Sequence, residues 1–265
     1  MHKYFTHFKI SLSNELEYRA DVFIRIAAHF IPILGFYYLW RSLYLQGAVY
    51  GSYDFRGLAT YFLVSSLINS WIPTYMVIDS MGEAIRTGVI SANLIKPLDF
   101  RFLKLSEFFS QRLVRLIVSF FLILASFFIF KSHLAFPSTL LTWATFLVSA
   151  SLSIILAFWL FFNFSIASFW LNRVGGFAFS LEVVSRFLNG SYIPLDLLPT
   201  QLQFFINLLP FKYIVFFPIQ IFLSQVSGWQ VFTGLVIQSG WILACYLLSR
   251  HAWRWGIYRY EAVGS

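Results

Sequence analysis

Residues 138–171 read STLLTWATFLVSASLSIILAFWLFFNFSIASFWL and decide the fold of this chain. They lie within 41 consecutive uncharged residues, 132–172, a length that two membrane spans of about 20 residues each would also fill. The stretch holds no Gly or Pro for a tight turn, however, while Pro137 suits the first turn of a helix and Asn172 its end. We therefore predict one long, tilted transmembrane helix over about 138–171.

The composition of the whole chain also indicates a membrane protein. Of its 265 residues, 59% are hydrophobic and 11% are charged, whereas a soluble domain has about 25% charged residues. A chain of this length and composition is one membrane domain, residues 1–265. Its single cysteine, Cys245, lies in an apolar run and is predicted to be a small buried hydrophobe.

Further segments complete a prediction of an all-α fold with six transmembrane helices. A stretch over about 1–20 has apolar residues at spacings of three and four, which predicts an amphipathic helix on the inner membrane surface. Two short helices, about 197–209 and 213–224, lie between prolines and are too short to cross, so we predict re-entrant or outer pieces. The six predicted spans are about 22–44, 57–78, 111–130, 138–171, 174–190 and 231–249.

The distribution of basic residues predicts which side each end occupies. The formal net charge is +8, but the basic residues stand between apolar runs, which favours a cytoplasmic bias of Lys and Arg over nucleic-acid binding. With six spans and both termini cytoplasmic, 14 of the 19 Lys and Arg fall inside: Lys3, Lys9, Arg19, Arg25, Arg86, Lys96, Arg101, Lys104, Arg112, Arg115, Arg173, Arg250, Arg254 and Arg259. We therefore expect a multi-pass protein of the cell (plasma or inner) membrane.

Polar residues within the predicted spans are few. Glu182 and Arg186 are four residues apart, so they share a helix face and can pair. A charge at mid-membrane costs about 2.5–3.5 kcal/mol, so the pair either lines a pathway or is structural. Asn69, Asn163 and Asn189 are predicted to donate hydrogen bonds between helices.

No sequence motif points to catalysis by this chain. The pattern G-x-x-x-x-G-K-[ST] of nucleotide-binding loops does not occur, the five histidines are scattered, and no catalytic cluster converges in the sequence. We therefore expect no enzyme activity, no metal and no cofactor of its own.

The segment between the second and third predicted spans, residues 79–108, reads DSMGEAIRTGVISANLIKPLDFRFLKLSEF. Asp79, Glu83 and Arg86 open a short helix, about 80–92. Its predicted apolar side is formed by Ala84, Ile85, Val89 and Ile90. Such an amphipathic helix on the inner face is typical of a docking element for a cytoplasmic partner, and the alternative is an interfacial helix without a partner.

Three parts of the chain together resemble the permeases of the ABC type-2 exporter family. The first is the pattern formed by Glu83, Arg86, Gly88, Ile90, Leu94, Ile95, Pro97 and Leu98, which resembles that family's coupling-helix segment. The second precedes the last span and consists of Gly190, Ile193, Pro194, Pro199, Leu209, Pro210 and Phe211. The third is the tail WRWGIYRYEAVGS, 253–265. The order and placement of these motifs carry the resemblance over nearly the whole chain.

The resemblance implies the transmembrane half of an ATP-driven exporter. Two permease chains, identical or related, would form the pathway, and ATP and Mg would bind a separate ATPase subunit. The implied contacts with that ATPase are Met81, Glu83, Ala84, Arg86, Thr87 and Val89. The implied outer re-entrant region holds Gly190, Pro194, Pro199 and Pro210.

Three other interpretations stay open from the sequence. One is a transporter that works without ATP, for which Glu182 with Arg186 and, weakly, His29 would supply the polar groups inside the membrane. The second is a membrane scaffold protein. The third is a lipid-modifying membrane enzyme, which would need convergent polar side chains that the sequence does not show. The substrate is not specified by any motif, although 33 Phe and 9 Trp residues favour an amphipathic or hydrophobic molecule.

Overall fold

The structure is a computed structural model that describes most of the chain. It describes residues 2–17, 53–72, 74–94, 99–130, 134–171 and 174–260, together with positions 35, 38, 39, 41 and 42. The predicted first span, 22–44, and Ile95, Pro97 and Leu98 of the coupling pattern lie outside these residues, apart from the five isolated positions.

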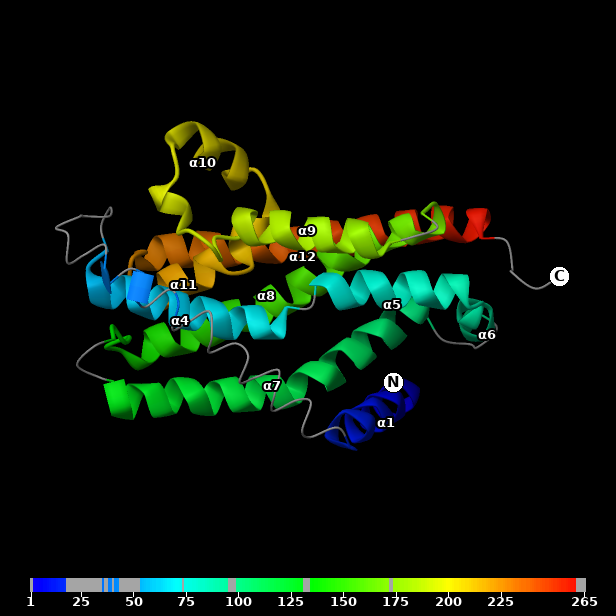
Figure 1. Cartoon of the computed structure of the whole chain (residues 1–265), viewed down its shortest axis with the longest axis horizontal. Coiled ribbons are helices and arrows are strands. Elements are labelled where there is room, and N and C mark those ends of the chain that lie inside the picture. The colour runs from blue at the N-terminus through cyan, green and yellow to red at the C-terminus, as the bar shows by residue number, and fades with distance from the viewer. Residues whose placement is uncertain are drawn as a thin grey trace.

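The predicted all-α class is confirmed, since helix makes up 83% of the structure and no strand occurs in the ranges just given. The helices form a bundle of long, roughly antiparallel rods, from which α10 projects (Figure 1). Their bounds are α1 His2–Glu17, α4 Phe55–Trp71, α5 Thr74–Arg86, α6 Val89–Leu94, α7 Phe100–Phe130, α8 Leu140–Ser165, α9 Gly175–Leu188, α10 Thr200–Asn207, α11 Phe216–Phe222 and α12 Gly228–Arg259. Short 3-10 helices occur at η1 Ile166–Phe169, η2 Leu195–Leu197 and η3 Pro210–Tyr213.

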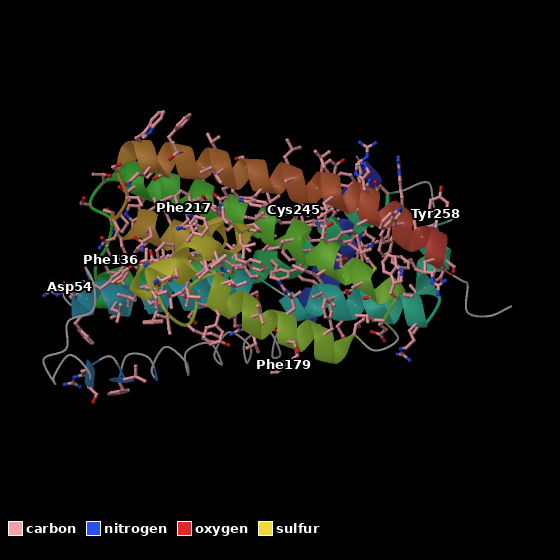
Figure 2. The ribbon with its side chains drawn as sticks, turned by 90° about the horizontal axis from the view of Figure 1, so that it is seen from above. Asp54, Phe136, Phe179, Phe217, Cys245 and Tyr258 are labelled. Carbon is pink, nitrogen blue, oxygen red and sulfur yellow. The ribbon has the colours of Figure 1, made fainter. Side chains whose placement is uncertain are left out.

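The segments that the charge distribution groups together lie at one end of the bundle. This end, which we call the α6 end, holds α1, the α5–α6 turn, the start of α9 and the C-terminal part of α12 (Figure 1). The opposite α10 end holds the start of α4, the end of α7 and the start of α12. In Figure 2, Asp54 and Phe136 lie at the α10 end and Tyr258 lies at the α6 end.

Three helices of the described residues are long and apolar enough to cross a membrane. They are Phe55–Arg86, which joins α4 and α5, Leu140–Phe169 and Gly228–Arg259. Thr200–Asn207 and Pro210–Phe222, bent by 80° at their junction, together make a fourth, broken candidate. The count of six spans stays a prediction.

Several predicted boundaries differ from those of the structure. The span predicted at 138–171 is one unbroken helical stretch, Leu140–Phe169, made of α8 and η1, and it begins after Thr139, whose hydroxyl accepts a hydrogen bond from Thr142 N at 3.2 Å. The span predicted at 57–78 instead starts at Phe55, because the Asp54 carboxylate caps Gly57 N at 2.7 Å. That at 174–190 is α9, whose 14 residues fall short of the roughly 20 that a crossing needs.

Two other predicted elements run longer than their apolar cores. The third span, expected at 111–130, is the last part of the 31-residue α7, and the last span, expected at 231–249, is part of the 32-residue α12. Basic residues near the end of α12 extend the helix rather than ending it, because cations are favourable near a helix C-terminus. The predicted N-terminal amphipathic helix is α1, which packs against α7; its place on the membrane surface stays a prediction.

Buried polar side chains tie the helices together. Gln238 on α12 donates through Nε2 to the carbonyl oxygens of Ser149 and Tyr213, each at 3.0 Å, so that it joins α12 to α8 and η3. Asn163 on α8 donates to Cys245 O on α12 at 2.8 Å, as its predicted interhelical role requires. Cys245 itself is buried, as expected. Such bonds matter in a membrane, where lipid is as apolar as the side chains and gives helices little hydrophobic reason to associate.

Aromatic rings fill the space between α7, α8 and α12. Phe100 stacks on Trp253 with ring centroids 5.1 Å apart, and Trp159 meets Tyr246 edge to face at 5.0 Å. Aromatic pairs of this kind each stabilise a protein by about 0.5–1.5 kcal/mol beyond the area they bury. The part of the bundle beside α6 is therefore firmly packed on its inner side.

Candidate functional site

The predicted docking helix is two helices in the structure. Asp79, Glu83 and Arg86 lie on the last turns of α5, which is the second helix of the candidate span Phe55–Arg86, and α6 follows. Gly88 separates them with a backbone φ of +73°, a left-handed conformation that suits glycine. The expected single helix over 80–92 is wrong because this turn interrupts it.

The turn at Gly88 also changes which residues face outward. Glu83, Arg86 and Thr87 are exposed, and Val89 is 52% exposed, although it was expected on the apolar side. The Thr87 hydroxyl donates to Glu83 O at 2.7 Å and closes the C-terminal turn of α5. Neither Glu83 nor Arg86 forms an ion pair within the ranges that the structure describes.

The opposite side of the segment packs into the bundle. Met81 and Ile90 are buried, Ile85 is partly buried against the core, and Ala84 is half-buried between the two sides. Met81, which the resemblance places among the ATPase contacts, therefore does not reach the surface. It lies instead on the wall of a cavity of about 60 Å³.

That small cavity lies where α5, α7 and α8 meet. Lys104 and Glu107 on α7 form an ion pair at 3.0 Å on its wall. Arg112, one turn further along α7, is 1% exposed; its Nη2 lies 3.6 Å from Met76 Sδ and its guanidinium 5.8 Å from the Phe108 ring centre. The α5 part of the segment thus lines a small cavity that carries charged side chains.

Three contacts join the α5–α6 segment to other helices. Ser91 on α6 hydrogen-bonds to the hydroxyl of Tyr260, just beyond the end of α12, at 2.8 Å. Gly82 on α5 lies so close to the start of α9 that a Cβ there would clash with Cγ2 of Val174, the residue before α9. The third contact is the wall of the small cavity, where α5 meets α7 and α8. Any displacement of the segment must therefore move these neighbours.

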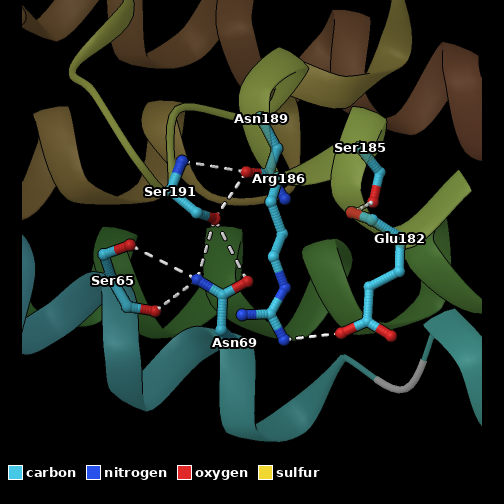
Figure 3. A network of polar contacts seen from close by, with 7 residues as sticks. All are labelled: Ser65, Asn69, Glu182, Ser185, Arg186, Asn189 and Ser191. Atoms are coloured by element: carbon cyan, nitrogen blue, oxygen red, sulfur yellow. Dashed lines mark hydrogen bonds and ion pairs between the residues drawn. The ribbon is translucent and has the colours of Figure 1, made fainter. Parts of the chain in front are cut away.

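A second group of polar contacts lies on the turn after α9, residues 189–191 (Figure 3). Asn69 on α4 donates through Nδ2 to Ser191 Oγ at 2.8 Å and to Ser65 O at 2.7 Å, so it joins α4 to this turn rather than to a second helix. Asn189 was also expected to donate between helices, but its Oδ1 accepts from Ser191 N at 2.9 Å instead. The turn therefore stabilises its own shape while Asn69 attaches it to α4.

Gly190 at the centre of this turn has little freedom to change. Its φ is +85°, and its carbonyl accepts a hydrogen bond from Tyr61 Oη at 2.7 Å. A Cβ at this position would lie 2.7 Å from the same oxygen of Tyr61 and 3.2 Å from Phe216 Cβ. The neighbouring carbonyl of Asn189 accepts from Phe216 N at 3.0 Å, which attaches the turn to α11 as well.

A third contact group connects the start of α4 to the segment before α10. The Tyr53 hydroxyl donates to Asp196 Oδ2 at 2.8 Å and accepts from Gln220 Nε2 on α11. Burial raises the pKa of the Tyr53 phenol, and the charge of Asp196 raises it further, so the hydroxyl keeps the proton it donates.

The prolines of the predicted outer region delimit its short helices. Pro194 is buried before η2, Pro199 precedes the first residue of α10, and Pro210 is buried at the start of η3. The two short helices expected here correspond to α10 and α11, and the chain bends by 80° between them. Whether they enter the membrane as re-entrant pieces stays a prediction.

Glu182 and Arg186 pair on α9, with Arg186 Nη2 2.6 Å from Glu182 Oε1. Both side chains are partly exposed, and Ser185 between them is buried. The pair lies beside the 189–191 turn in Figure 3, and the backbone carbonyl of Arg186 accepts a hydrogen bond from Ser191 N at 3.0 Å, although no side-chain hydrogen bond joins the pair to the turn within the described residues. Its geometry is that of a local helix pair.

Sequence reasoning missed several of these residues. Gln238 and Gln220 are uncharged amides in apolar runs, and an amide within a predicted span is itself a signal of helix contacts. Tyr53 and Tyr61 gave no signal, because an aromatic residue near a span end is common in any membrane protein. Arg112 was counted only as a basic residue at the inner end of a span, and its burial follows from packing.

The chain matches one known protein family. A family model described as ABC-2 family transporter protein covers residues 30–264, which is most of the 265-residue chain. No curated protein and no solved structure gives a match. The resemblance to ABC type-2 permeases inferred from the motifs is therefore confirmed.

Proposed function

Because the chain belongs to the ABC-2 family of membrane transporter proteins, we propose that it is the transmembrane subunit of an ATP-driven exporter. In this proposal it pairs with a second permease chain, identical or related, to form the substrate pathway in the cell membrane. A separate cytoplasmic ATPase subunit carries ATP and Mg, and this chain performs no chemistry itself.

The observation that carries the proposal is the two-sided character of the α5–α6 segment. Its outer side presents Glu83, Arg86, Thr87 and Val89 to the surroundings. Its inner side packs into the bundle through Met81 and Ile90. A charged, exposed surface on a short helical element that continues a membrane-crossing helix is suited to receive a partner protein and to pass its movement on.

The mechanism follows from the contacts of this segment. ATPase closure would bias the permease between two arrangements, since a partner shifts an equilibrium by its different affinity for the two states. A push on Glu83 and Arg86 would act along α5 on the cavity beneath Met81. The Ser91–Tyr260 hydrogen bond would carry the same movement to α12.

The α10 end would close the exit of the pathway. There the 189–191 turn is hydrogen-bonded to α4 and α11. Two further hydrogen bonds of the Tyr53 hydroxyl, to Asp196 and from Gln220, join the start of α4 to η2 and α11. Opening would require these hydrogen bonds to break or shift together. This end would face away from the ATPase, and both termini would lie in the cytoplasm.

Co-purification of the chain with a candidate ATPase subunit, followed by an ATPase assay in proteoliposomes, tests the proposal. Stimulation of ATP hydrolysis by the permease is expected, and Glu83→Ala and Arg86→Ala should abolish transport while the complex stays folded. Arg259→Ala is the matched control, because Arg259 is exposed at the same end of the bundle but on α12. Full transport in the Glu83 and Arg86 variants, or a functional complex without a nucleotide-hydrolysing subunit, would refute the proposal.

A further inference from the structure

The candidate span Gly228–Arg259, which is α12, is much more exposed than the other two unbroken candidates. Only 17% of its apolar part is buried inside the bundle, against 60% and 67% for the others. In Figure 2 it runs along one edge of the bundle, and side chains project away from it. A crossing of about 20 residues, or about 30 Å, that begins at Gly228 ends at Leu247. The helix continues to Arg259, so its last turns lie beyond the hydrocarbon layer.

A hollow of about 240 Å³ lies on α12 at this point. Its lining residues are three and four positions apart, which places them on one face of the helix: Leu247, Arg250, His251 and Arg254. His251 donates from Nδ1 to Leu247 O at 2.9 Å, so a ligand would meet its other ring nitrogen, Nε2. One turn before Leu247, Leu243 is 57% exposed. The hollow is therefore basic at one end and continuous with an exposed apolar surface at the other.

The two arginines of the hollow have their charges available for a ligand. Both are exposed, and neither Arg250 nor Arg254 forms an ion pair within the part of the chain that the structure describes. Asp99, just before α7, lies near enough to Arg250 for the two charges to interact. Its carboxylate is paired with Arg101, however, at 2.5 Å. The hollow thus has a net positive charge that suits an anion.

The spacing along α12 matches the layers of a membrane surface. A helix rises 1.5 Å per residue, so Arg250 and Arg254 lie about 4.5 and about 10.5 Å beyond Leu247. The headgroup layer on each side of a bilayer is about 5–7 Å thick. Because side chains on a helix tilt toward its N-terminus, the guanidinium of Arg254 reaches back toward this layer. Trp255 and Tyr258, 76 and 88% exposed, follow on the same turns, and such aromatic residues are typical of the headgroup level.

We propose that this hollow binds an anionic phospholipid of the membrane leaflet at the α6 end. The phosphate lies between Arg250 and Arg254, whose guanidinium groups donate charge-assisted hydrogen bonds to its oxygens. One acyl chain follows Leu247 and Leu243 along α12. A water-soluble partner would fit the basic half of the hollow only, because the apolar half lies at the depth of the hydrocarbon layer. This site goes beyond the proposed function, because it belongs to one permease chain and needs neither an ATPase nor a second subunit.

Native mass spectrometry of the full chain, released from detergent micelles, tests the site by counting bound lipids. The chain is titrated with phosphatidylglycerol, which is anionic, and with phosphatidylcholine of the same chain lengths, which is zwitterionic. We expect one phosphatidylglycerol to bind at least about tenfold more tightly than phosphatidylcholine, because two arginines act on its charge. Equal affinities for the two lipids would overturn the proposal.

Variants separate the hollow from the general positive charge of this end. Arg250→Gln and Arg254→Gln should each weaken phosphatidylglycerol binding by about fivefold, and the double variant by about thirtyfold. Arg259→Gln removes the same charge from the end of α12 but outside the hollow, and should leave the affinity unchanged. All three residues are exposed, and melting temperatures in detergent verify that the variants are folded. Equal weakening by all three single variants would show that only net charge attracts the lipid, and the proposal would be wrong.

Competition shows whether the hollow takes a lipid or a free anion. Inorganic phosphate is added at millimolar concentration, with chloride adjusted to keep the ionic strength constant. Phosphatidylglycerol should stay bound, because the acyl chain on Leu247 and Leu243 adds affinity that a free phosphate lacks. Displacement of the lipid by phosphate would mean that the hollow is a site for soluble anions, and the proposal would be overturned.

The same measurements exclude a protein as the occupant. If the double arginine variant changes the oligomeric state but not lipid binding, a second copy of the chain covers the hollow and the proposal is wrong. If the complex with an ATPase subunit no longer binds the lipid that the chain alone binds, the ATPase covers the hollow, which also contradicts the proposal. Retention of the lipid in the complex supports it. Failure of the lipid test leaves the coupling proposal untouched, because Glu83 and Arg86 lie outside the hollow.

Discussion

At the α10 end, the 189–191 turn receives hydrogen bonds from Tyr61 and Asn69 on α4 and from Phe216 on α11, whereas at the α6 end Glu83 and Arg86 are exposed and make no ion pair in the described residues. The first region satisfies its polar groups internally. The second leaves charged groups available. A bundle that is moved from outside needs such a difference, because the receiving surface must be open while the far end must hold its shape until the movement arrives.

The most severe test of this comparison is Gly190→Ala. The left-handed backbone and the close approach of Tyr61 Oη predict a loss of stability of about 2–4 kcal/mol, from backbone strain plus a damaged buried hydrogen bond. The measurement is the apparent melting temperature of the purified chain in detergent.

Gly176→Ala is the matched control, because Gly176 lies within the helical range of α9 and a Cβ there meets nothing within 4 Å. It should be neutral or slightly stabilising, since alanine favours the helix more than glycine does. Equal melting temperatures for the two variants would show that the 189–191 turn is not held as tightly as its contacts indicate.

A smaller loss is expected for Asn69→Ala. The variant removes the donor to Ser191 and Ser65, and interhelical hydrogen bonds in membranes contribute about 0.6 kcal/mol on average and up to about 1.7 kcal/mol. Ser239→Ala serves as the control, because Ser239 is exposed and, among the described residues, its hydroxyl bonds to Leu235 O in its own helix. If Asn69→Ala and Ser239→Ala have the same melting temperature, the position of α4 does not depend on its hydrogen bond to the turn.

The sequence was enough for the parts of the fold that depend on composition and periodicity. The long helix over 138–171, the short helices between prolines and the family resemblance all came from local patterns. The end of the docking helix did not, because Gly88 was read as part of a motif rather than as a left-handed turn. The burial of Met81 followed from the packing of three helices, which no pattern on one helix contains.

The polar contacts show the same limit at the level of single atoms. A pattern can place Asn69 and Asn189 inside the bundle, but only the geometry shows that Asn69 donates from α4 to the 189–191 turn while Asn189 accepts within that turn. Likewise, the spacing of Glu182 and Arg186 predicted that they pair. Their partial exposure, which depends on the neighbours of α9, decides how much the pair contributes.

A double-mutant cycle on that pair is expected to give a smaller energy than either variant above. Glu182→Gln, Arg186→Gln and the double variant should show a coupling of about 0.5 kcal/mol, because a partly exposed i, i+4 pair is screened by its surroundings. The apparent melting temperatures of the three variants supply the cycle. A coupling several times larger would mean that a membrane or a second chain encloses the pair. It would then support the hypothesis that Glu182 and Arg186 line the pathway.

The smallest effect on stability is expected for the two exposed charges of the α6 end, Glu83 and Arg86. Glu83→Gln and Arg86→Gln should change stability by less than about 0.5 kcal/mol, because both side chains are exposed and no ion pair is lost in the described residues. Ile90→Ala on the buried side of the same segment should cost about 2–5 kcal/mol, since it empties core space. Melting temperatures of the isolated chain measure both. A loss in the Glu83 or Arg86 variants as large as that of Asn69→Ala would mean that the α6 end, too, is fixed from within, and its exposed charges would then no longer be available to a partner.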